Sequence, residues 1–448
     1  MPQDTAARFP THVAIIVDGN RRWAKQRMLP VSVGHKAGFD RLREITRYAV
    51  GDRGVFVLSL YVFSTENFSR DAKEVGYLMD LFANNFRTIA DEMNERGCKV
   101  LFSGRREGLQ QRVLDAMDYM MDLTKDNDKG IVNFCLNYGS HAELTDAMRD
   151  ALQKYPVGGV CQFGKNIVDP EQITAFNAAL QEASDILLFI SVDEEGGAVA
   201  RLANKDTFDL PRYESAAAVG AEGADAACAM GQTIGGYLRT YGFNMDFAPD
   251  ADVNTNPDNP IIGTRAFSSD AADAADCAAA MARGLAGEGI LPTFKHFPGH
   301  GDTAEDSHTG LAYSYRTVEE LAACELLPFE AAAEVGPHAV MVGHIVVPEL
   351  TGDLPATLCA DAIALVPDAE NTLIVTDSLA MGAITDSYTP GEAAVQALQA
   401  GCDVLLMPDG LADAYDAVLA AVQNGTLSED RLDLSVNKIL RMKAQFCA

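Results

Sequence analysis

Residues 292–308 read PTFKHFPGHGDTAEDSH, an apolar stretch that ends in histidines and carboxylates. A second apolar stretch, TLIVTDSLAMG at 372–382, ends in the same way at Asp377. Short apolar runs that end in polar residues are typical of buried parallel strands, whose carboxyl ends carry ligand-binding side chains. The two stretches therefore predict an α/β fold with a carboxylate and an acid/base group at one edge of a sheet, an arrangement suited to glycoside cleavage.

Apolar runs of the same kind recur on both sides of these stretches. They lie at 157–163, 186–197, 244–253, 339–348 and 403–408, and Ala-rich helical patterns occupy 216–241, 269–288 and 391–400. Alternating strands and helices predict a parallel sheet with helical cover. Seven such strands predict a (β/α)₈ TIM-type barrel that is one strand short, with its site at the carboxyl ends of the strands.

The first third of the chain predicts a separate parallel sheet. Buried strands are expected at 12–17, 55–63, 98–104 and 131–139, with helices over 34–50, 72–96 and 108–124. We therefore expect two α/β domains, 1–154 and 155–448, because 448 residues are enough for each domain to bury its own core.

Charge is divided unevenly between the two parts. Residues 1–155 hold 22 Lys+Arg and 21 Asp+Glu, whereas residues 156–448 hold 13 and 43, so their net charges are +1 and −30. Such an acidic surface repels nucleic acid and anionic membranes, so we expect neither as a partner. We also expect no membrane span, since no run of about 18 apolar residues occurs. Nothing in the sequence predicts an oligomeric state.

The cysteines and the N-terminus both bear on location. The nine cysteines are scattered and form no Cys-x-x-Cys pair, which is typical of reduced thiols. The N-terminal MPQDTAARFPTH lacks the charged-then-apolar pattern of a secretion signal. Both observations predict a cytoplasmic protein.

The residues after the first strand would suit a diphosphate. Asp18 ends that strand, Gly19 permits close approach of the backbone, and Arg21, Arg22 and Arg27 supply positive charge. A following helix N-terminus would add N–H donors, and Asp18 would hold Mg²⁺ against phosphate oxygens. The alternative is a plain Asp-Gly-Asn turn before a solvated basic helix.

Longer motifs favour the diphosphate. HVAIIVDGNRRWAKQR (12–27), GHKAG (34–38), YVFSTENFSR (61–70) and LNYGSHAEL (136–144) resemble the cis-prenyltransferases, the undecaprenyl diphosphate synthase family. The resemblance implies an allylic prenyl diphosphate as ligand, Mg²⁺ held by Asp18, and a site made by Asp18, Gly19, Asn20, Arg22, His35, Ser64, Glu66, Asn67 and Arg70. Only half of that site is expected, because nothing after residue 155 matches the family's Arg-x-Ser-Gly-Glu segment for isopentenyl diphosphate.

The polar strand ends of the second part each have a functional and a structural interpretation. Asp193 suits sugar hydroxyls or an acidic turn, and Arg265 suits a polar ligand group or a pair with the acidic surface. His344 is more typical of a packed barrel histidine. The three histidines within 295–308 suggest a zinc cluster, but their spacing matches no zinc template.

Five motifs of the second part occur together in an informative order. They are VDEEGGAVARL (192–202), NMDFAPDADVNTNP (244–257), KHFPGHGDTAEDSH (295–308), AVMVGHIVVP (339–348) and IVTDSLAMGAI (374–384). Together they resemble the β-N-acetylhexosaminidase branch of glycoside hydrolase family 3. The match begins at the family's usual second strand, so the expected barrel lacks its usual first strand–helix unit.

This resemblance implies a role for each site residue. Asp377 would be the nucleophile of a retaining double displacement, and His308, oriented by Asp306, the general acid/base. A histidine suits that role because its pKa lies near neutrality. The sugar would be held by Asp193, Arg201, Arg265, Lys295 and His296. The implied substrate is a small carbohydrate with terminal N-acetyl-β-glucosamine, from cell walls or chitin, and the implied glycosidase needs no cofactor.

The junction between the two parts suggests a substitute for the missing unit. Residues 131–138 form a strand, residues 141–154 a helix, and the chain then runs directly into 157–163. We predict that this strand and helix take the place of the first barrel unit. The alternative is an inactive fusion in which the motifs persist in an open barrel, since open sheet edges favour aggregation.

Overall fold

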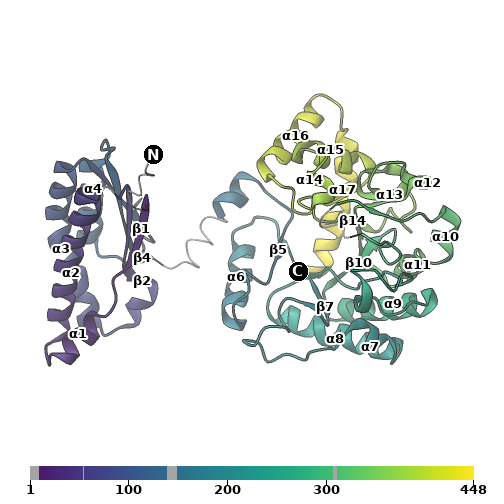
Figure 1. The fold of residues 1–448 in the computed structure, drawn as a ribbon, viewed down its shortest axis with the longest axis horizontal. Helices are drawn as coiled ribbons and strands as arrows, with labels where there is room; N and C mark the ends of the chain where they lie inside the picture. The colour runs from purple at the N-terminus through teal and green to yellow at the C-terminus, as the bar shows by residue number, and fades with distance from the viewer. Residues whose placement is uncertain (1–9, 54, 139–148, 306–309, 448) are drawn as a thin grey trace, which may run out of the picture. The chain divides into compact units, whose positions relative to one another are not determined.

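The computed structural model describes residues 10–53, 55–138, 149–305 and 310–447 (Figure 1). The chain divides into two compact units, Met1–Ala147 (unit 1) and Met148–Ala448 (unit 2). Each unit has a hydrophobic core of its own. Among the described residues, no helix is both long enough and apolar enough to cross a membrane.

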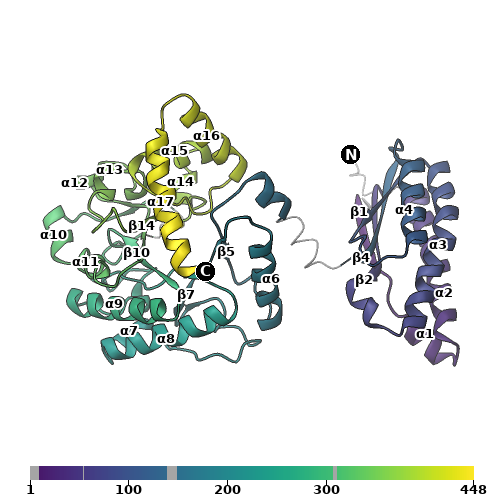
Figure 2. The same cartoon turned by 180° about the vertical axis from the view of Figure 1, so that it is seen from behind.

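Unit 1 is a four-stranded parallel sheet in the order β1–β2–β4–β3. Its strands are β1 (His12–Ile16), β2 (Val57–Ser64), β3 (Cys98–Ser103) and β4 (Gly130–Tyr138), and its helices are α1 (Asn20–Gln26), α2 (Val31–Arg47), α3 (Ala72–Glu95) and α4 (Gln111–Thr124), with short turns η1 (Tyr48–Asp52) and η2 (Thr65–Ser69). The four expected strands and three expected helices are therefore confirmed; α1 is an additional helix. Helices α2, α3 and α4 cover one face of the sheet (Figures 1 and 2).

Buried apolar side chains at every second position of the strands explain which face of the sheet the helices cover. Leu58 and Leu60 of β2 and Val132 and Phe134 of β4 are buried, and they pack with Phe86 of α3 in one core. Helix α3 begins where Asp71 accepts a hydrogen bond from the Lys73 N–H (2.9 Å), which satisfies one of the free amides of the first turn.

Unit 2 is a curled parallel half-barrel. Its main sheet has the order β14–β12–β10–β9–β6–β5, and a single parallel bridge joins Val375 to Val404 beyond β14. The strands of the sheet are β5 (Gly159–Gln162), β6 (Phe189–Val192), β9 (Met245–Asp246), β10 (Leu291–Phe297), β12 (Ala339–Val342) and β14 (Leu373–Thr376); small pairs are formed by β7 (Glu194–Gly196) with β8 (Val199–Ala200) and by β11 (Ala312–Tyr313) with β13 (Ile345–Val346).

Helices surround this sheet (Figures 1 and 2). They are α6 (Pro170–Glu182), α7 (Ala216–Gly220), α8 (Ala224–Thr240), α9 (Ala271–Gly287), α10 (Val318–Ala323), α11 (Leu327–Ala332), α12 (Pro348–Thr351), α13 (Ala360–Ile363), α14 (Gly382–Thr385), α15 (Pro390–Ala400), α16 (Leu411–Gln423) and α17 (Glu429–Phe446), with short turns η3 (Gly263–Arg265) and η4 (Ala356–Leu358). Helix α17 packs Met442 and Phe446 against the first residues of several strands, so it closes the amino end of the half-barrel. The carboxyl end is left for the site.

The predicted substitute for the first barrel strand is wrong. Strand β4 pairs with β2 on one side and β3 on the other, and its apolar side chains are buried in the core of unit 1, so both of its edges are already used. Only the residues before β5 behave as expected of a covering helix. Residues 149–154 are helical, Leu152 lies in the core of unit 2, and Tyr155 packs edge-to-face on Tyr415 of α16 (ring centroids 5.4 Å apart).

Candidate active site

Charged side chains gather at the carboxyl ends of the strands of unit 2. Asp193 follows β6, Lys295 and His296 lie in β10, and Asp377 follows β14. Parallel strands that end at one edge of a sheet place the residues after them close together, which explains why segments far apart in sequence meet here.

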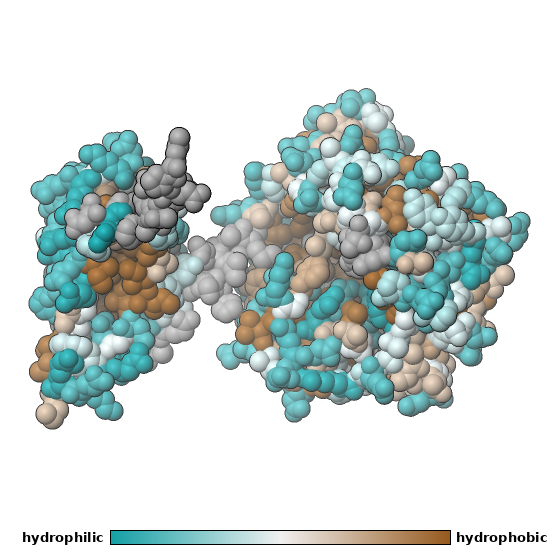
Figure 3. Space-filling model, in the orientation of Figure 1, coloured by the Kyte–Doolittle hydropathy of each residue, from teal (hydrophilic) through white to brown (hydrophobic). Residues whose placement is uncertain are grey.

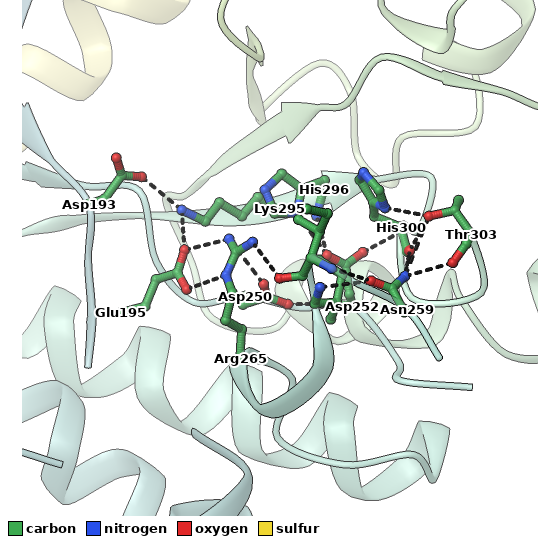
Figure 4. A network of polar contacts seen from close by, with 12 residues as sticks. Asp193, Glu195, Asp250, Asp252, Asn259, Arg265, Lys295, His296, His300 and Thr303 are labelled. Atoms are coloured by element: carbon green, nitrogen blue, oxygen red, sulfur yellow. Dashed lines mark hydrogen bonds and ion pairs between the residues drawn. The ribbon is translucent and has the colours of Figure 1, made fainter. Parts of the chain in front are cut away.

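Lys295 connects two acidic residues of the loop after β6 (Figure 4). Its Nζ lies 2.9 Å from Asp193 Oδ1 and 2.6 Å from Glu195 Oε1. Arg265 donates to the same Glu195 through Nη2 (2.7 Å) and Nε (2.8 Å), so that carboxylate accepts from two cations. Burial alone would raise the pKa of Glu195, but the charges of Arg265 and Lys295 outweigh burial and hold that pKa well below its ordinary value.

Asp193 keeps one oxygen for a second cation. Arg201 Nη2 lies 3.2 Å from Asp193 Oδ2, and the side chains of both residues are partly exposed. Four of the five expected sugar-binding residues are thus brought into one ion-pair network: Asp193, Arg201, Arg265 and Lys295. A row of donors and acceptors of this kind can bind vicinal hydroxyls.

The fifth, His296, belongs to a second cluster beside this network (Figure 4). Its Nδ1 lies 2.7 Å from Asp252 Oδ2, and Asp252 Oδ1 accepts the backbone N–H of His300 (2.6 Å). Burial acts to lower the pKa of His296, but the Asp252 carboxylate outweighs it and raises that pKa. An imidazolium is thus favoured next to Asp252, with its ring orientation fixed by the carboxylate.

The pKa of Asp250 is raised by its burial and by a second carboxylate that lies close to it. Burial and the neighbouring Asp252 charge raise its pKa to about 7, although Arg265 lies 3.3 Å away and opposes the shift. The ligand atoms of Asp250, Asp252 and His296 all lie within 4.8 Å of one another, as a metal site would require. The positive charges of Arg265 and Lys295 beside them disfavour a cation, so the trio is better explained by ion pairing.

Asp377 lies at the end of β14 with a defined orientation. Its backbone N–H donates to the Val342 carbonyl (2.9 Å), and its Oδ1 accepts the Ser378 N–H (2.7 Å). Burial acts to raise the pKa of Asp377, but the charges of His344, His296 and Lys295 and the Ser378 bond lower it overall. The carboxyl group is therefore held ionised, as a nucleophile requires.

His344 supports this position from the next strand end. Its Nε2 lies 2.9 Å from the Ser378 carbonyl and its Nδ1 lies 2.8 Å from Thr357 Oγ1. The ring is fully buried. These contacts agree with the packed, hydrogen-bonded histidine that the sequence suggested, and they attach it to the residue after Asp377.

The expected acid/base pair, Asp306 and His308, lies outside the described residues. The segment before it is held by Asp302, whose Oδ2 accepts from Ser314 Oγ (3.1 Å) and Arg316 Nε (3.2 Å). Three residues of the network were not predicted: Glu195, Asp250 and Asp252. Their signal is their place in the segments that follow β6 and β9, where charged residues inside an apolar core must find partners.

Unit 1 contains a cavity of about 420 Å³ at the ends of β1 and β2. One part of its lining is polar and comprises Asp18, Gly19, Asn20, Arg21, Arg22, His35, Asn67 and Arg70; the other part is apolar and comprises Val17, Phe39, Leu42, Val62, Leu78, Leu81 and Phe82. A basic entrance joined to an apolar interior suits an anionic head group with a hydrocarbon tail.

Glu74 of α3, which the sequence did not single out, organises the basic part. Its Oε1 lies 3.0 Å from His35 Nε2, 3.2 Å from Arg70 Nη1 and 3.8 Å from Arg21 Nε. Asp18 pairs instead with Arg22 (2.7 Å), and Asn67 Nδ2 donates to Ser64 Oγ (2.6 Å).

Eight of the nine expected diphosphate residues therefore lie at or beside this cavity, and the Glu66 side chain lies outside the described part. Asp18 is the single carboxylate among the described lining residues. Mg²⁺ often takes one carboxylate and completes its coordination with substrate phosphates and water, so Asp18 fits that ion only together with a diphosphate.

Comparison with known proteins finds two families along the chain. Residues 126–442 match the family described as "Glycosyl hydrolase family 3 N terminal domain", and residues 16–195 match "Putative undecaprenyl diphosphate synthase", so the matches overlap over 126–195. The chain is 34% identical over 320 residues to beta-hexosaminidase LpqI of Mycobacterium tuberculosis, covering 67% of this chain and 80% of that protein. It is 31% identical to beta-hexosaminidase A of Pseudoalteromonas piscicida, of which it spans 56%.

The similar solved structures and the isoprenyl transferases match different parts of the chain. A glycoside hydrolase family 3 beta-N-acetylglucosaminidase from Paenibacillus sp. superposes with a TM-score of 0.65 at 39% identity, covering 67% of this chain and 59% of that one. An isoprenyl transferase of Enterococcus faecalis is 44% identical over 146 residues, which are 33% of this chain and 54% of that protein. The chain therefore belongs to glycosyl hydrolase family 3, and its N-terminal third is a region of the undecaprenyl diphosphate synthase family.

Proposed function

We propose that unit 2 is a retaining glycosidase that releases terminal N-acetyl-β-glucosamine from cell-wall or chitin-type sugars. The observation that carries this proposal is the partly buried Asp377 carboxylate at the end of β14, whose pKa is lowered by its positive neighbours. Similarity to beta-hexosaminidases supports the choice of sugar.

The reaction follows from the roles proposed for the residues. Asp377 attacks the anomeric carbon while His308 gives a proton to the leaving oxygen, and a covalent glycosyl-enzyme forms. His308 then takes a proton from water, which attacks the same carbon and releases Asp377. Two inversions give net retention. The network of Asp193, Arg265 and Lys295 would hold the sugar hydroxyls throughout.

Hydrolysis of 4-nitrophenyl N-acetyl-β-glucosaminide by the purified chain tests this proposal. We expect turnover, release of the β-anomer as the first product by NMR, and loss of turnover in Asp377→Ala. A severe slowing is expected in His308→Ala, and the substrate with a 2-hydroxyl in place of the acetamido group is the control for sugar choice. Full activity of either variant would contradict the assignment.

We propose as a second function that unit 1 binds an allylic prenyl diphosphate. The cavity of about 420 Å³ favours this ligand because its basic and apolar parts match a diphosphate and a prenyl chain. When bound, Mg²⁺ would neutralise phosphate charge beside Asp18. Binding is proposed and synthesis is not, since the match spans about half of the isoprenyl transferases.

Isothermal titration with farnesyl diphosphate, with and without Mg²⁺, tests the second function. Saturable binding that Mg²⁺ strengthens is the expected result, and inorganic diphosphate is the control that separates head-group binding from tail binding. No heat of binding in either condition would reject it.

We also propose that the protein acts in a reducing compartment, the cytoplasm. None of the nine cysteines, which all lie in the described part of the chain, forms a disulfide, and all seven in unit 2 are partly or fully buried. Fractionation of the source cells, with immunodetection of the chain, would locate it; recovery from the periplasm or medium would contradict the proposal.

A further inference from the structure

Unit 2 contains an apolar groove that plays no part in the site described above. It has a volume of about 500 Å³, and residues 157–161 and 403–408 line its two sides. Phe189, Met245 and Val375, which belong to the core inside the curled sheet, also line it. Figure 3 shows apolar side chains in a hollow of this unit near the place of β5 in Figure 1.

One side of the groove is the free edge of β5, which is the last strand of the sheet. The Gly158 carbonyl accepts the Phe189 N–H (3.1 Å) on the side of β6. Because successive backbone groups of a strand point to opposite edges, the amides of Gly159 and Cys161 point away from β6 and toward the groove.

The other side is also a strand edge. The Val404 N–H donates to the Ile374 carbonyl (3.0 Å), and the Val404 carbonyl accepts the Thr376 N–H (3.0 Å), so both groups face β14. By the same alternation, the amide of Leu405 faces the groove. Two parallel edges therefore present backbone donors and acceptors across one apolar space.

The number of strands indicates what is absent from this space. Six strands of the sheet and the bridged segment at Val404 make seven parallel positions among the described residues of unit 2. Parallel barrels with helical cover close with eight. The groove lies between the first and last of the seven positions, so it corresponds to one strand.

We propose that the groove binds one extended β-strand from another polypeptide, which completes an eight-stranded barrel. The strand runs parallel to β5, and its alternate apolar side chains enter the space beside Cys161. Lys or Arg residues flank it, because the exposed Asp409 and Asp413 lie at the α16 side and residues 156–448 carry a net charge of −30.

Backbone chemistry favours a strand over a hydrocarbon chain. An apolar ligand would fill the volume but would leave the amides of Gly159, Cys161 and Leu405 desolvated and without hydrogen-bond partners, which is unfavourable. A strand satisfies both edges and fills the volume together.

The test uses the full chain and a fluorescein-labelled peptide in which Val and Ala alternate between two pairs of lysines. We expect saturable binding by anisotropy, and hydrogen exchange slowed by about tenfold or more in 159–162 and 404–407. A peptide with proline at alternate positions is the control and is expected not to bind, because alternate residues of a strand face the same edge and proline cannot donate to it.

Three outcomes would overturn the proposal. They are no saturable binding, binding that leaves exchange in these segments unchanged (an apolar ligand site only), and slow exchange that appears without peptide as protein concentration rises (a second copy as occupant). Cys161→Phe fills the groove from inside and should weaken binding by about tenfold or more, whereas Val168→Phe, at a residue 51% exposed outside the groove, should not. Circular dichroism confirms that both variants fold.

Discussion

Asp377 is the residue on which the proposed glycosidase reaction depends. Burial acts to raise its pKa, but the charges of His344 and His296 outweigh burial and lower that pKa overall, so the ionised carboxylate is favoured. Asp377→Asn should lower kcat by about 10³-fold or more and change KM little, because the lost interaction is made in the transition state. Steady-state kinetics on the nitrophenyl substrate measure both constants, with the exposed Asp386→Asn as the matched control. A rise in KM with an unchanged kcat would show instead that Asp377 contributes to substrate binding.

Asp250 should make the stability of unit 2 depend on pH. Its pKa is about 7 in the folded protein, mainly because of burial, against 3.8 in an unfolded chain. The folded state therefore holds a proton that the unfolded state has lost, so the stabilisation present below about pH 4 is lost as pH rises to about 7. Asp250→Asn, which mimics the protonated acid, should remove this part of the slope.

Urea unfolding at pH 5 and pH 8 measures that slope. The difference between the two free energies of unfolding should shrink in Asp250→Asn by about 1–3 kcal/mol, relative to the exposed Asp258→Asn. An unchanged difference would mean that Arg265 keeps Asp250 ionised throughout this range.

Glu195 should contribute more to stability than any surface carboxylate. It is 2% exposed and pairs with both Arg265 and Lys295, so Glu195→Gln leaves two buried cations with too little negative charge. Loss of one partner of a buried pair costs about 3–5 kcal/mol. Calorimetry should show a lower melting temperature than in the exposed Glu222→Gln. A shift no larger than that of the control would show that Asp193 and Asp250 suffice to pair these cations.

At the scale of elements, helices α8 and α9 depend on two glycines. A Cβ on Gly284 would overlap the backbone carbonyl of Cys228, and one on Gly231 would overlap the carbonyl of Met281. Gly284→Ala should therefore separate the helices and lower the free energy of unfolding by about 1–3 kcal/mol. Gly287 lies on the same helix with nothing within 4 Å, so Gly287→Ala should be neutral or slightly stabilising. Urea unfolding of both variants gives the comparison, and equal stability of the two would contradict it.

Strand ends were predictable at this scale, whereas strand partners were not. The apolar runs at 292–302 and 372–382 carry site residues near the ends of their strands, at Lys295 and Asp377. The partners of strand β4 were wrongly predicted. Its sequence, IVNFCLNYG, indicates a buried strand but does not indicate to which sheet the strand belongs. Its pairing with β2 and β3 is decided by the cores on which those strands also depend.

At the scale of the whole molecule, the two proposed functions should be separable by mutation. Arg70 pairs with Glu74 at the unit 1 cavity, so Arg70→Ala should weaken farnesyl diphosphate binding by about tenfold or more and leave sugar hydrolysis unchanged. Asp377→Asn should have the opposite effects. The exposed Arg41→Ala is the control for the loss of a unit 1 cation. If either variant lost both farnesyl diphosphate binding and sugar hydrolysis, the two sites would not be separate.

The division of charge, the two sets of motifs, and the order of strands and helices are determined by the sequence alone, because they are local properties of the chain. The sequence likewise indicates Asp193, Lys295, His296 and Asp377, since each lies at the end of an apolar run. Their partners Glu195, Asp250 and Asp252 were decided by the tertiary structure. So was the open strand position between β5 and residues 403–408. Ion pairing and barrel closure depend on which distant segments meet, and burial of the two cores decides that.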